Sequence, residues 1–324
     1  MADSTQARET KPSQGNPLTP TAELFRLDGR SIIITGGIGF LGLTVAQSVL
    51  ENGGDAYCLD YLDSPRPEIW TPLEQVAKKY TGVVQYHQCD VTNADSVHET
   101  VAAVASAARF PIRGLVACAG VSDKDPATEF SVERFRRLMD INVTGTFLAA
   151  QAVARAMRDA NVGGSMVLVA SMSGTVVNKG VDTAAYNSSK SALLQLARSL
   201  AAEWGSRQNM PLIRVNTLSP GYIRTAATVD TLKIPGIEAQ WCGDNMLNRL
   251  STVDEFRAPV LILSCVFVLA IAHSKSLLKP SVPDFCQLVS QAIESTELWA
   301  VSDSTWEVIL GILKTIQQKQ RLWF

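Results

Sequence analysis

A short apolar run that leads directly into a glycine-rich turn constrains the fold of this chain most strongly. The run, Ser31 to Thr35 (SIIIT), is rich in β-branched side chains, which is typical of a strand buried on both faces of a parallel sheet. The turn GGIGFLG follows at once, and a helical pattern begins near Leu43. Backbone N–H groups and a helix dipole face outward at such a junction. The order of strand, turn and helix therefore predicts a site for a dinucleotide pyrophosphate.

Apolar runs alternate with helical segments along the rest of the chain. Further strands are predicted at residues 55–60, 83–88, 114–118, 165–170 and 213–218. Strands separated by helices of this length favour parallel pairing with right-handed crossovers. We therefore predict an α/β fold with a Rossmann-type doubly wound parallel sheet in a single domain.

The chain divides into three parts by composition. Residues 1–22 contain three prolines and no apolar run, which predicts a disordered tail and not a secretory signal. Residues 23–263 carry the alternating pattern and form the predicted dinucleotide-binding domain. Residues 264–324 show no recognisable pattern and are predicted to be an atypical carboxyl-terminal segment. The apolar run from Val260 to Ala272 has 13 residues, whereas a membrane span needs about 20, so no anchor is expected.

Composition argues against several classes of partner. The chain has 324 residues, 46% of them hydrophobic, which is enough for one large core or two modest ones. Its formal net charge of −2 gives no electrostatic reason to expect nucleic acid or an anionic membrane surface. The six cysteines form no C-x-x-C pair and the three histidines show no ligand spacing. We therefore expect buried thiols, a reducing cytoplasmic location and no metal site.

Tyr186 and Lys190 are the first candidates for chemistry. They lie four residues apart on a predicted helix, so both side chains can point at one small volume. A free phenol has a pKa of about 10, and a neighbouring positive charge lowers that pKa. A shift of about three units would correspond to roughly 4 kcal/mol. We expect Lys190 to lower the pKa of Tyr186, although this spacing also occurs by chance on many amphipathic helices.

Other polar candidates lie at predicted strand ends or inside a helix. Asp60 ends the second strand, 18 positions after the glycine turn, where it can bind a ribose 2′-OH and repel a 2′-phosphate. Arg66 is the one nearby basic group that could accommodate such a phosphate. Ser171 and Ser173 follow the fifth strand, at the edge where open α/β sheets bind ligands. Asn142 lies within a helical segment, where its amide competes for backbone hydrogen bonds.

Taken together, these motifs resemble those of the short-chain dehydrogenase/reductase family over residues 24–263. The resemblance rests on TGGIGFLG, the strand-end Asp60, CDVT, CAG, INVTG, ASMSG, YNSSK and SPGYIRT, which occur in the family's order. Within the family, the chain is similar to single-domain polyol and sugar-ketone reductases of the mannitol, arabinitol, sorbose and xylulose type. The resemblance implies hydride transfer between a nicotinamide cofactor and a ketone or secondary alcohol. The small-molecule substrate would be a polyol, a ketose or a biosynthetic carbonyl intermediate.

The resemblance also implies a role for four catalytic residues. Tyr186 would be the general acid/base, and Lys190 would hold the nicotinamide ribose and depress the pKa of Tyr186. Ser171 would polarise the substrate oxygen, with Ser173 as the alternative. Asn142 would position a water that relays protons to Lys190.

A second set of residues is implied in cofactor binding. The set comprises Gly36, Ile38, Leu41 and Gly42 in the glycine turn, with the Leu41 backbone on the pyrophosphate; Asp60 at the adenosine ribose; Asp90 and Val91 around the adenine; Ile223 and Thr225 near the nicotinamide amide; and Asn142, Tyr186 and Lys190. Asp60 and the lack of a basic residue at Ile38 slightly favour NAD, and NADP stays open.

The sequence departs from the family pattern in three places. Phe40 stands where a glycine is usual, so the turn is closer to that of the extended, epimerase-type branch. The fourth strand ends in ACAG where asparagines are usual. No stretch after residue 263 matches the usual last strand, so the sequence predicts that this strand is missing or replaced. The resemblance implies a homo-oligomer, whereas the loss of this strand would leave a sheet edge open and disturb a common tetramer interface.

Two alternative functions follow from the same motifs. One is a nucleotide-sugar epimerase or dehydratase of the extended branch, which would need a substantial carboxyl-terminal substrate domain. The other is a non-catalytic dinucleotide-binding protein. The intact set of Ser171, Tyr186 and Lys190 argues against this second alternative.

Overall fold

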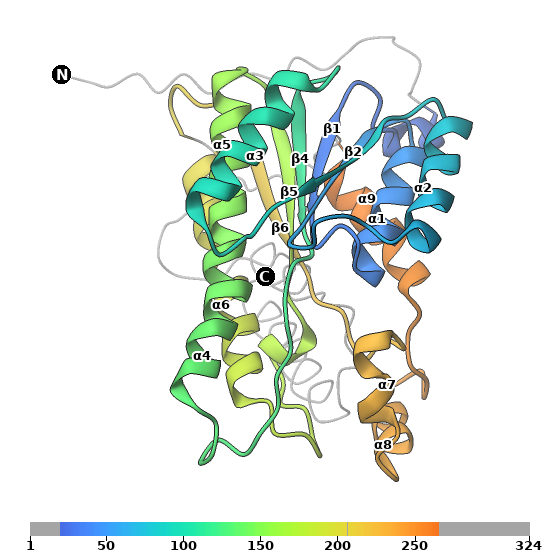
Figure 1. Cartoon of the computed structure of the whole chain (residues 1–324), viewed down its shortest axis with the longest axis vertical. Helices are drawn as coiled ribbons and strands as arrows, with labels where there is room; N and C mark the ends of the chain where they lie inside the picture. Colours follow the sequence, from blue (N-terminus) through green and yellow to red (C-terminus); the bar gives the residue numbers. More distant parts are fainter. Residues whose placement is uncertain (1–19, 206, 266–324) are drawn as a thin grey trace, which may run out of the picture.

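Six parallel strands form the central layer of the protein (Figure 1). The computed structural model describes residues 20–205 and 207–265. The strands are β1 (Ser31–Thr35), β2 (Asp55–Asp60), β3 (Val84–Gln88), β4 (Ile112–Ala117), β5 (Gly164–Val169) and β6 (Ile213–Leu218). Their order across the sheet is β3-β2-β1-β4-β5-β6, so the chain reverses its direction of winding between β1 and β4. The predicted Rossmann-type sheet is confirmed, and ligands bind such sheets at this reversal.

Helices cover both faces of the sheet. They are α1 (Phe40–Glu51), α2 (Pro67–Lys79), α3 (Ala94–Ala107), α4 (Val132–Met139), α5 (Gly145–Asp159), α6 (Ala184–Gly205), α7 (Ala226–Leu232), α8 (Ile237–Gly243) and α9 (Arg257–Ser264). Short 3-10 turns occur at Thr21–Phe25, Met172–Gly174 and Val253–Phe256. Figure 1 shows α3, α5 and α6 on one face and α1, α2 and α9 on the other. Among the described residues, none of these helices combines the length and hydropathy needed to cross a bilayer.

The core lies on both sides of the strands. All five residues of β1 are buried, as expected for a strand covered on both faces. Ile33 packs toward α3, α5 and α6, whereas Ile32 and Ile34 pack toward α1, α2 and α9. This alternation follows from the two-residue period of a strand. The packing of β1 on both faces fixes the position of the glycine turn that follows the strand.

Several boundaries differ from the sequence prediction. Helix α1 begins at Phe40, three residues earlier than expected, because the turn ends at Gly39 in an extended N-cap conformation. The 3-10 turn Thr21–Phe25 spans the boundary predicted at residue 23. Residues 1–19 of the predicted tail and residues 266–324 of the predicted last segment lie outside the described residues.

Hydrogen bonds hold α9, the last described helix, against the sheet. The Ser165 hydroxyl in β5 donates a hydrogen bond to the carbonyl of Leu263 at 2.6 Å. Arg214 in β6 donates to the carbonyl of Cys265. Within residues 20–205 and 207–265, β6 forms one edge of the sheet and β3 the other. These contacts anchor α9 beside β5, opposite α6.

Candidate active site

The glycine turn fits closely against neighbouring backbone. Gly36 has a φ of +63°, and a Cβ there would lie 2.7 Å from the nitrogen of Ala119. A Cβ on Gly42 would lie 2.1 Å from the carbonyl oxygen of Gly36. Both distances are too short for a side chain, so glycine is required at these two positions.

Helix α1 begins immediately after this turn. The N–H of Leu43 donates to the carbonyl of Gly39 at 2.9 Å, which is the first bond of the helical ladder. The preceding N–H groups of Phe40, Leu41 and Gly42 have no acceptor within the ladder, as at any helix start. Phe40 is 55% exposed, so it does not occupy the interior of the turn. The turn therefore keeps the donors and the dipole that a pyrophosphate requires.

Asp60 lies beside the turn at the end of β2. Its Oδ2 accepts a hydrogen bond from the N–H of Ile38 at 3.4 Å, and its Oδ1 accepts one from Tyr61 at 2.9 Å. Burial raises the pKa of Asp60, and the backbone hydrogen bonds lower it in part. Arg66 is exposed at the N-cap of α2, six residues further along the chain. Asp60 therefore lies beside the glycine turn, and its assignment to the adenosine ribose stays a prediction.

Asp90 and Val91 follow the end of β3. The Asp90 carboxylate accepts hydrogen bonds from the N–H and hydroxyl of Thr92 at 2.9 and 2.8 Å. Val91 is buried against Gly145, where a Cβ would lie 2.8 Å from a Val91 methyl carbon. Val91 therefore packs the end of β3 against the start of α5.

Asn142 occupies a π-helical turn, Asp140–Thr144, between α4 and α5. Its side chain is fully buried. The Oδ1 accepts a hydrogen bond from the N–H of Val121 at 2.8 Å. The Nδ2 donates to the carbonyl of Val121 and to the hydroxyl of Ser189, each at 2.9 Å. These partners explain how an asparagine is accommodated inside a helical segment, and π-turns are frequent at functional sites.

Ser171 and Tyr186 bring two hydroxyl groups together. Ser171 follows β5 and Tyr186 lies in the first turn of α6, and the Ser171 side chain is near enough to the phenol to lower its pKa. Ser171 also donates to the Ser173 hydroxyl and accepts a bond from the Ser173 N–H, both at 3.1 Å. Of the two serines, Ser171 is therefore the one that acts on Tyr186, and Ser173 holds Ser171 in place.

Lys190 lies one helical turn beyond Tyr186 and is 5% exposed. Its Nζ donates to the carbonyl of Val169 at 2.8 Å and lies 5.7 Å from the centre of the Tyr186 ring. Burial lowers the pKa of Lys190 to about 8, against a smaller opposing effect of the Cys118 thiol. Thus the amine is near the phenol but is bonded to the end of β5.

The expected lowering of the Tyr186 pKa is wrong for this arrangement. Burial raises the pKa of Tyr186, and the hydrogen bond with Ser171 lowers it only in part. The physical reason is that desolvation of the phenolate outweighs the neighbouring groups. The side chains therefore hold Tyr186 in its protonated form at neutral pH.

Ile223 and Thr225 lie beyond the end of β6. Ile223 forms a parallel bridge with Ser251, and Thr225 is the N-cap of α7. The N–H of Thr225 donates to the hydroxyl of Thr228 at 2.9 Å. The two predicted residues therefore lie where the chain leaves the sheet for α7.

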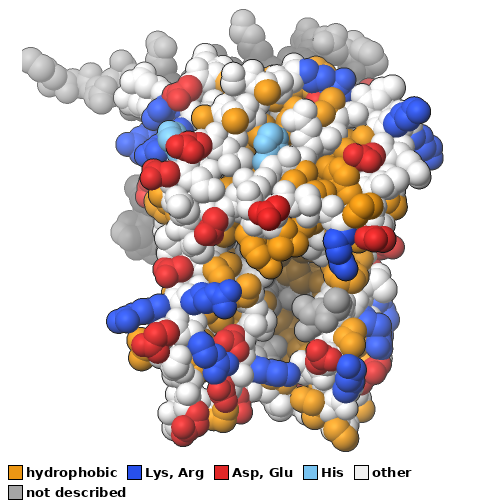
Figure 2. All heavy atoms as spheres, in the orientation of Figure 1, with side chains coloured by type: hydrophobic (Ala, Val, Ile, Leu, Met, Phe, Trp, Pro, Cys, Tyr) orange, Lys and Arg blue, Asp and Glu red, His pale blue; other side chains and the backbone are white. Residues whose placement is uncertain are grey.

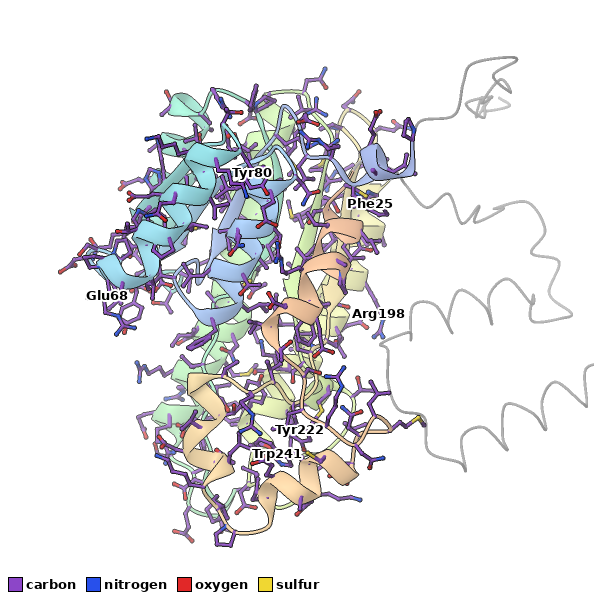
Figure 3. All side chains as sticks on the ribbon, turned by 90° about the vertical axis from the view of Figure 1, so that its right-hand side faces the viewer. Phe25, Glu68, Tyr80, Arg198, Tyr222 and Trp241 are labelled. Carbon is purple, nitrogen blue, oxygen red and sulfur yellow. The ribbon has the colours of Figure 1, made fainter. Side chains whose placement is uncertain are left out.

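An aromatic pair links the same end of β6 to α8. The rings of Tyr222 and Trp241 stack with centroids 4.1 Å apart and planes within 5° (Figure 3). The amide of Asn178 donates to the Tyr222 hydroxyl at 3.4 Å. Helices α7 and α8 lie within residues 226–248, the segment that follows β6. Figure 2 shows the surface hollowed between the α7 and α8 side and the α4 side.

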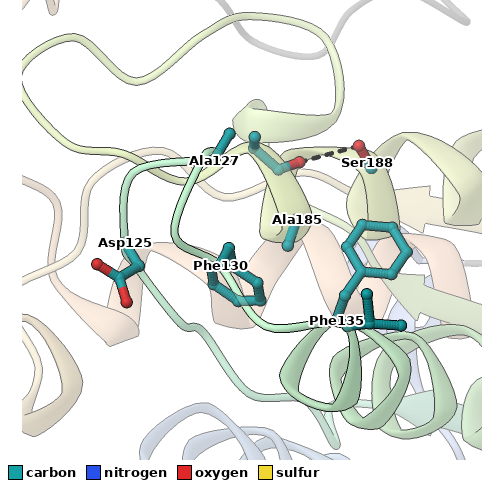
Figure 4. A pocket seen from close by; sticks show the side chains of 8 residues that line it. Asp125, Ala127, Phe130, Phe135, Ala185 and Ser188 are labelled. Carbon is teal, nitrogen blue, oxygen red and sulfur yellow. Dashed lines mark hydrogen bonds between the residues drawn. The ribbon is translucent and has the colours of Figure 1, made fainter.

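A separate cavity of about 260 Å³ lies on another side of α6 (Figure 4). Its lining consists of Asp125, Ala127, Phe130, Val132, Phe135, Ala184, Ala185 and Ser188. None of the four predicted catalytic residues lines it. We therefore place the candidate site at the carboxyl edge of the sheet and not in this cavity.

The structure brings the predicted residues together in two groups. One is the glycine turn with Asp60, and the other is the cluster of Asn142, Ser171, Tyr186 and Lys190.

Sequence reasoning missed the roles of Ser189 and Val121, which hold Asn142. The available signal was that Ser189 directly precedes Lys190 in the sequence. Adjacent residues of a helix point to different faces, so Ser189 must contact another part of the site than Lys190 does. Among the described residues, no group of three or more His, Cys, Asp or Glu side chains could hold a metal ion.

A parallel sheet with a glycine turn, a strand-end carboxylate and a buried hydroxyl and amine cluster defines a class of protein. This class comprises the nicotinamide-dependent oxidoreductases. Comparison with known proteins identifies the family within that class.

A short-chain dehydrogenase model described as enoyl-(acyl carrier protein) reductase matches residues 37–265. The short chain dehydrogenases/reductase notP′ of Aspergillus versicolor is 59% identical over 258 residues, which is 80% of this chain and 88% of the relative. The D-arabinitol 2-dehydrogenase (ribulose-forming) of Candida albicans strain WO-1 is 34% identical, over 74% of this chain and 87% of the relative. The chain belongs to the short-chain dehydrogenase/reductase family. It is an NAD(P)-dependent oxidoreductase that acts on CH–OH and C=O groups.

Two further similarities concern the cofactor. The NADH-dependent L-xylulose reductase of Ambrosiozyma monospora is 30% identical, over 76% of this chain and 92% of the relative. The crystal structure of the NADPH-dependent 3-quinuclidinone reductase from Rhodotorula rubra is 30% identical, with a TM-score of 0.68 over 78% of this chain and 91% of that chain. Relatives of both cofactor preferences are therefore similar to this protein. The comparisons give no support to the extended-branch alternative.

Proposed function

We propose that the protein interconverts a ketone and a secondary alcohol with Tyr186, Lys190, Ser171 and Asn142 as its catalytic group. The observation that carries this proposal is the convergence of the Ser171 side chain on the Tyr186 phenol, whose pKa it lowers in part, with the buried Lys190 amine one turn away. Two hydroxyls at one point can bind the same carbonyl oxygen. With two hydroxyls, one can polarise the oxygen while the other donates the proton.

The roles of the side chains follow from their surroundings. When bound, the nicotinamide exchanges a hydride with the substrate carbon. Ser171 polarises the substrate oxygen, and Tyr186 donates its proton to that oxygen during reduction. Burial keeps the Tyr186 pKa raised, so the phenol carries this proton at neutral pH. Lys190 is a cation below its pKa of about 8 and favours the phenolate that proton transfer creates.

The residues at the glycine turn fit a dinucleotide. A Cβ at Gly36 or Gly42 would fill the turn, and the first-turn N–H groups of α1 can bind a pyrophosphate. The Asp60 carboxylate lies beside the Ile38 N–H, where it would accept hydrogen bonds from a ribose. A carboxylate at this place would repel a 2′-phosphate, so we propose NAD as the preferred cofactor.

Replacing Asp60 with alanine is expected to weaken this preference. Hydrogen bonds to a charged group contribute about 1.5–3 kcal/mol, so kcat/KM for NADH should fall roughly 10- to 100-fold. The value for NADPH should stay constant or rise, because a repulsive charge is removed. Steady-state kinetics with both cofactors would measure this change. An equal fall for NADH and NADPH would contradict the assignment of Asp60 to the ribose.

We propose a polyol or ketose as the substrate class. The arabinitol and xylulose enzymes support this choice, although the relative with 59% identity is named without a substrate. A biosynthetic ketone is the competing class, because the loop that contacts substrate varies most in such folds. Parallel assays with ketoses and with aliphatic or aromatic ketones separate these two classes.

Replacing Tyr186 with phenylalanine is expected to abolish turnover. The substitution removes one oxygen and keeps the ring, so the proton donor is lost while the fold is retained. Activity should fall by about 10³-fold or more, and the dissociation constant for NADH should change less than about threefold. Absorbance at 340 nm and fluorescence titration with NADH would measure the two quantities. Normal turnover by the variant would refute the mechanism.

We also propose that residues 23–263 act as one catalytic domain in the cytoplasm. The five cysteines among the described residues are free, with Cys58, Cys89 and Cys265 buried, which supports a reducing compartment. A homo-oligomer remains a prediction, which size-exclusion chromatography with light scattering would test.

A further inference from the structure

We propose that Tyr86 and Gln88 of β3 hold the loop after β2 so that a second carboxylate, that of Asp63, lies near Asp60 and excludes a cofactor with a 2′-phosphate. The loop comprises residues 61–66, between β2 and α2. This inference rests on the proposed function, because it assumes that Asp60 binds the adenosine ribose. Asp63, Tyr86 and Gln88 belong to neither of the two groups that form the candidate site.

The side chains of this loop are largely exposed. Tyr61 is 70% exposed and Leu62 is 40% exposed, and Asp63 and Ser64 are exposed as well. Apolar burial therefore contributes little to the conformation of the loop. The hydrogen-bond partners of its polar groups fix that conformation instead.

Tyr86 supplies the first of these partners. Its hydroxyl donates to the carbonyl of Leu62 and, at 3.2 Å, to the carbonyl of Asp60. The Tyr86 ring packs edge-on against Trp70 of α2, with centroids 6.0 Å apart and planes at 79°. The hydroxyl therefore joins the end of β2, which carries the Asp60 carboxylate, to the loop that follows it.

Gln88 supplies the second partner. It lies opposite Asp60 in the parallel pairing of β2 and β3. Its Nε2 donates to Oδ1 of Asp63 at 2.6 Å and, at 3.4 Å, to the carbonyl of Tyr61. The Asp63 carboxylate is therefore held at the end of β3, the strand end beside which Asp60 lies.

These contacts bring two carboxylates to one place. Burial, followed by the charges of Asp60 and Asp63, raises the pKa of Tyr86 to about 12. The Tyr86 hydroxyl therefore stays protonated at neutral pH and keeps donating to the loop. A 2′-phosphate brought to Asp60 would meet a second negative charge at Asp63, whereas an uncharged 2′-OH would not be repelled.

Asp63→Asn tests the second charge in the full-length chain. The substitution keeps an oxygen that can accept from Gln88, so the loop retains this contact while one negative charge is removed. We expect kcat/KM for NADPH to rise about 3- to 10-fold, with the value for NADH within about twofold of the original. Glu74→Gln, on the exposed face of α2, is the matched control and should change neither value.

Tyr86→Phe and Gln88→Ala test the positioning role. Tyr86→Phe removes the hydroxyl and keeps the ring that packs against Trp70, so the KM for NADH should rise about 3- to 10-fold while kcat stays within about twofold. Gln88→Ala releases the Asp63 carboxylate, so kcat/KM for NADPH should rise about two- to threefold, less than in Asp63→Asn. Gln85→Ala replaces an exposed glutamine of the same strand and should have neither effect.

Steady-state kinetics with both cofactors and thermal unfolding of each variant separate this role from a general loss of structure. An NADPH value in Asp63→Asn no higher than in Glu74→Gln would overturn the inference. So would an unchanged KM for NADH in folded Tyr86→Phe, or an equal loss with NADH and NADPH. If Tyr86→Phe does not fold, Asp63→Asn decides the question alone. Unchanged kinetics of Asp60→Ala with both cofactors would instead overturn the ribose assignment in the proposed function.

Discussion

Replacing Lys190 with methionine is expected to make the protein inactive and, at pH 7, more stable. Methionine has a similar length and no charge, so the buried volume is retained. The pKa of Lys190 is lowered from 10.5 to about 8 by burial. A difference of this size corresponds to about 3 kcal/mol of cost for the charged form in the folded state. Leaving the Val169 carbonyl without its donor costs about 1 kcal/mol, so a net gain of about 2 kcal/mol is expected.

The gain should depend on pH in a definite direction. Between pH 8 and 10.5, the unfolded chain binds more protons at this lysine than the folded protein does. The stability of the original protein therefore rises with pH across this window, and below pH 8 the full cost is present. The advantage of Lys190→Met should be greatest at or below pH 7 and should disappear by about pH 10.5. Denaturant unfolding at several pH values would measure it.

The Lys190→Met variant is also expected to lose activity. Loss of the amine should reduce kcat/KM by about 10³-fold, the size of effect usual for a group in acid–base catalysis. A variant that is inactive and no more stable at pH 7 would show that Lys190 is not desolvated as described. A variant that is stable and fully active would show that the amine has no part in the reaction. Lys79→Met, on the exposed end of α2, is a suitable control for removing a lysine charge.

The order of elements was predictable from the sequence because each strand has its own periodic signal. The run SIIIT is buried at every position, and residues 213–218 form a strand with the predicted bounds. The glycine turn was also predictable, since its glycines lie between a strand pattern and a helical pattern in the sequence. Such signals are local, and they survive without knowledge of tertiary contacts.

The pKa shifts of Tyr186 and Lys190 were not predictable from the sequence in the same way. The i and i+4 spacing correctly predicted that Tyr186 and Lys190 share a region, and their separation of 5.7 Å from ring centre to Nζ agrees with this. Their pKa shifts depend on burial, with smaller effects of Ser171 on Tyr186 and of the Cys118 thiol on Lys190, and these two groups belong to other segments of the chain. The π-turn around Asn142 likewise depends on Val121 and Ser189, which belong to distant segments. No pattern within one helix contains that information.

Replacing Gly42 with alanine is expected to abolish cofactor binding and to destabilise the protein. The added Cβ would lie 2.1 Å from the carbonyl oxygen of Gly36, so the turn and the start of α1 must move apart. Overpacking of this kind costs about 1–3 kcal/mol. The displaced first-turn N–H groups would no longer converge on a pyrophosphate, so affinity for NADH should fall by about 100-fold or more. Isothermal titration with NADH and thermal unfolding would measure the two effects.

Two other glycines give this prediction a graded comparison. A Cβ on Gly39 would lie 3.2 Å from the same Gly36 oxygen, which a small shift can relieve, so Gly39→Ala should have a milder effect on both quantities. A Cβ on Gly205, at the end of α6, meets no atom within 4 Å, so Gly205→Ala should keep full affinity and stability. If Gly42→Ala bound NADH as tightly as Gly205→Ala, the turn would not be the pyrophosphate site. Phe40 is unchanged in all three variants. The series therefore tests whether NADH binding requires the close approach of backbone atoms in the turn or a given number of glycines.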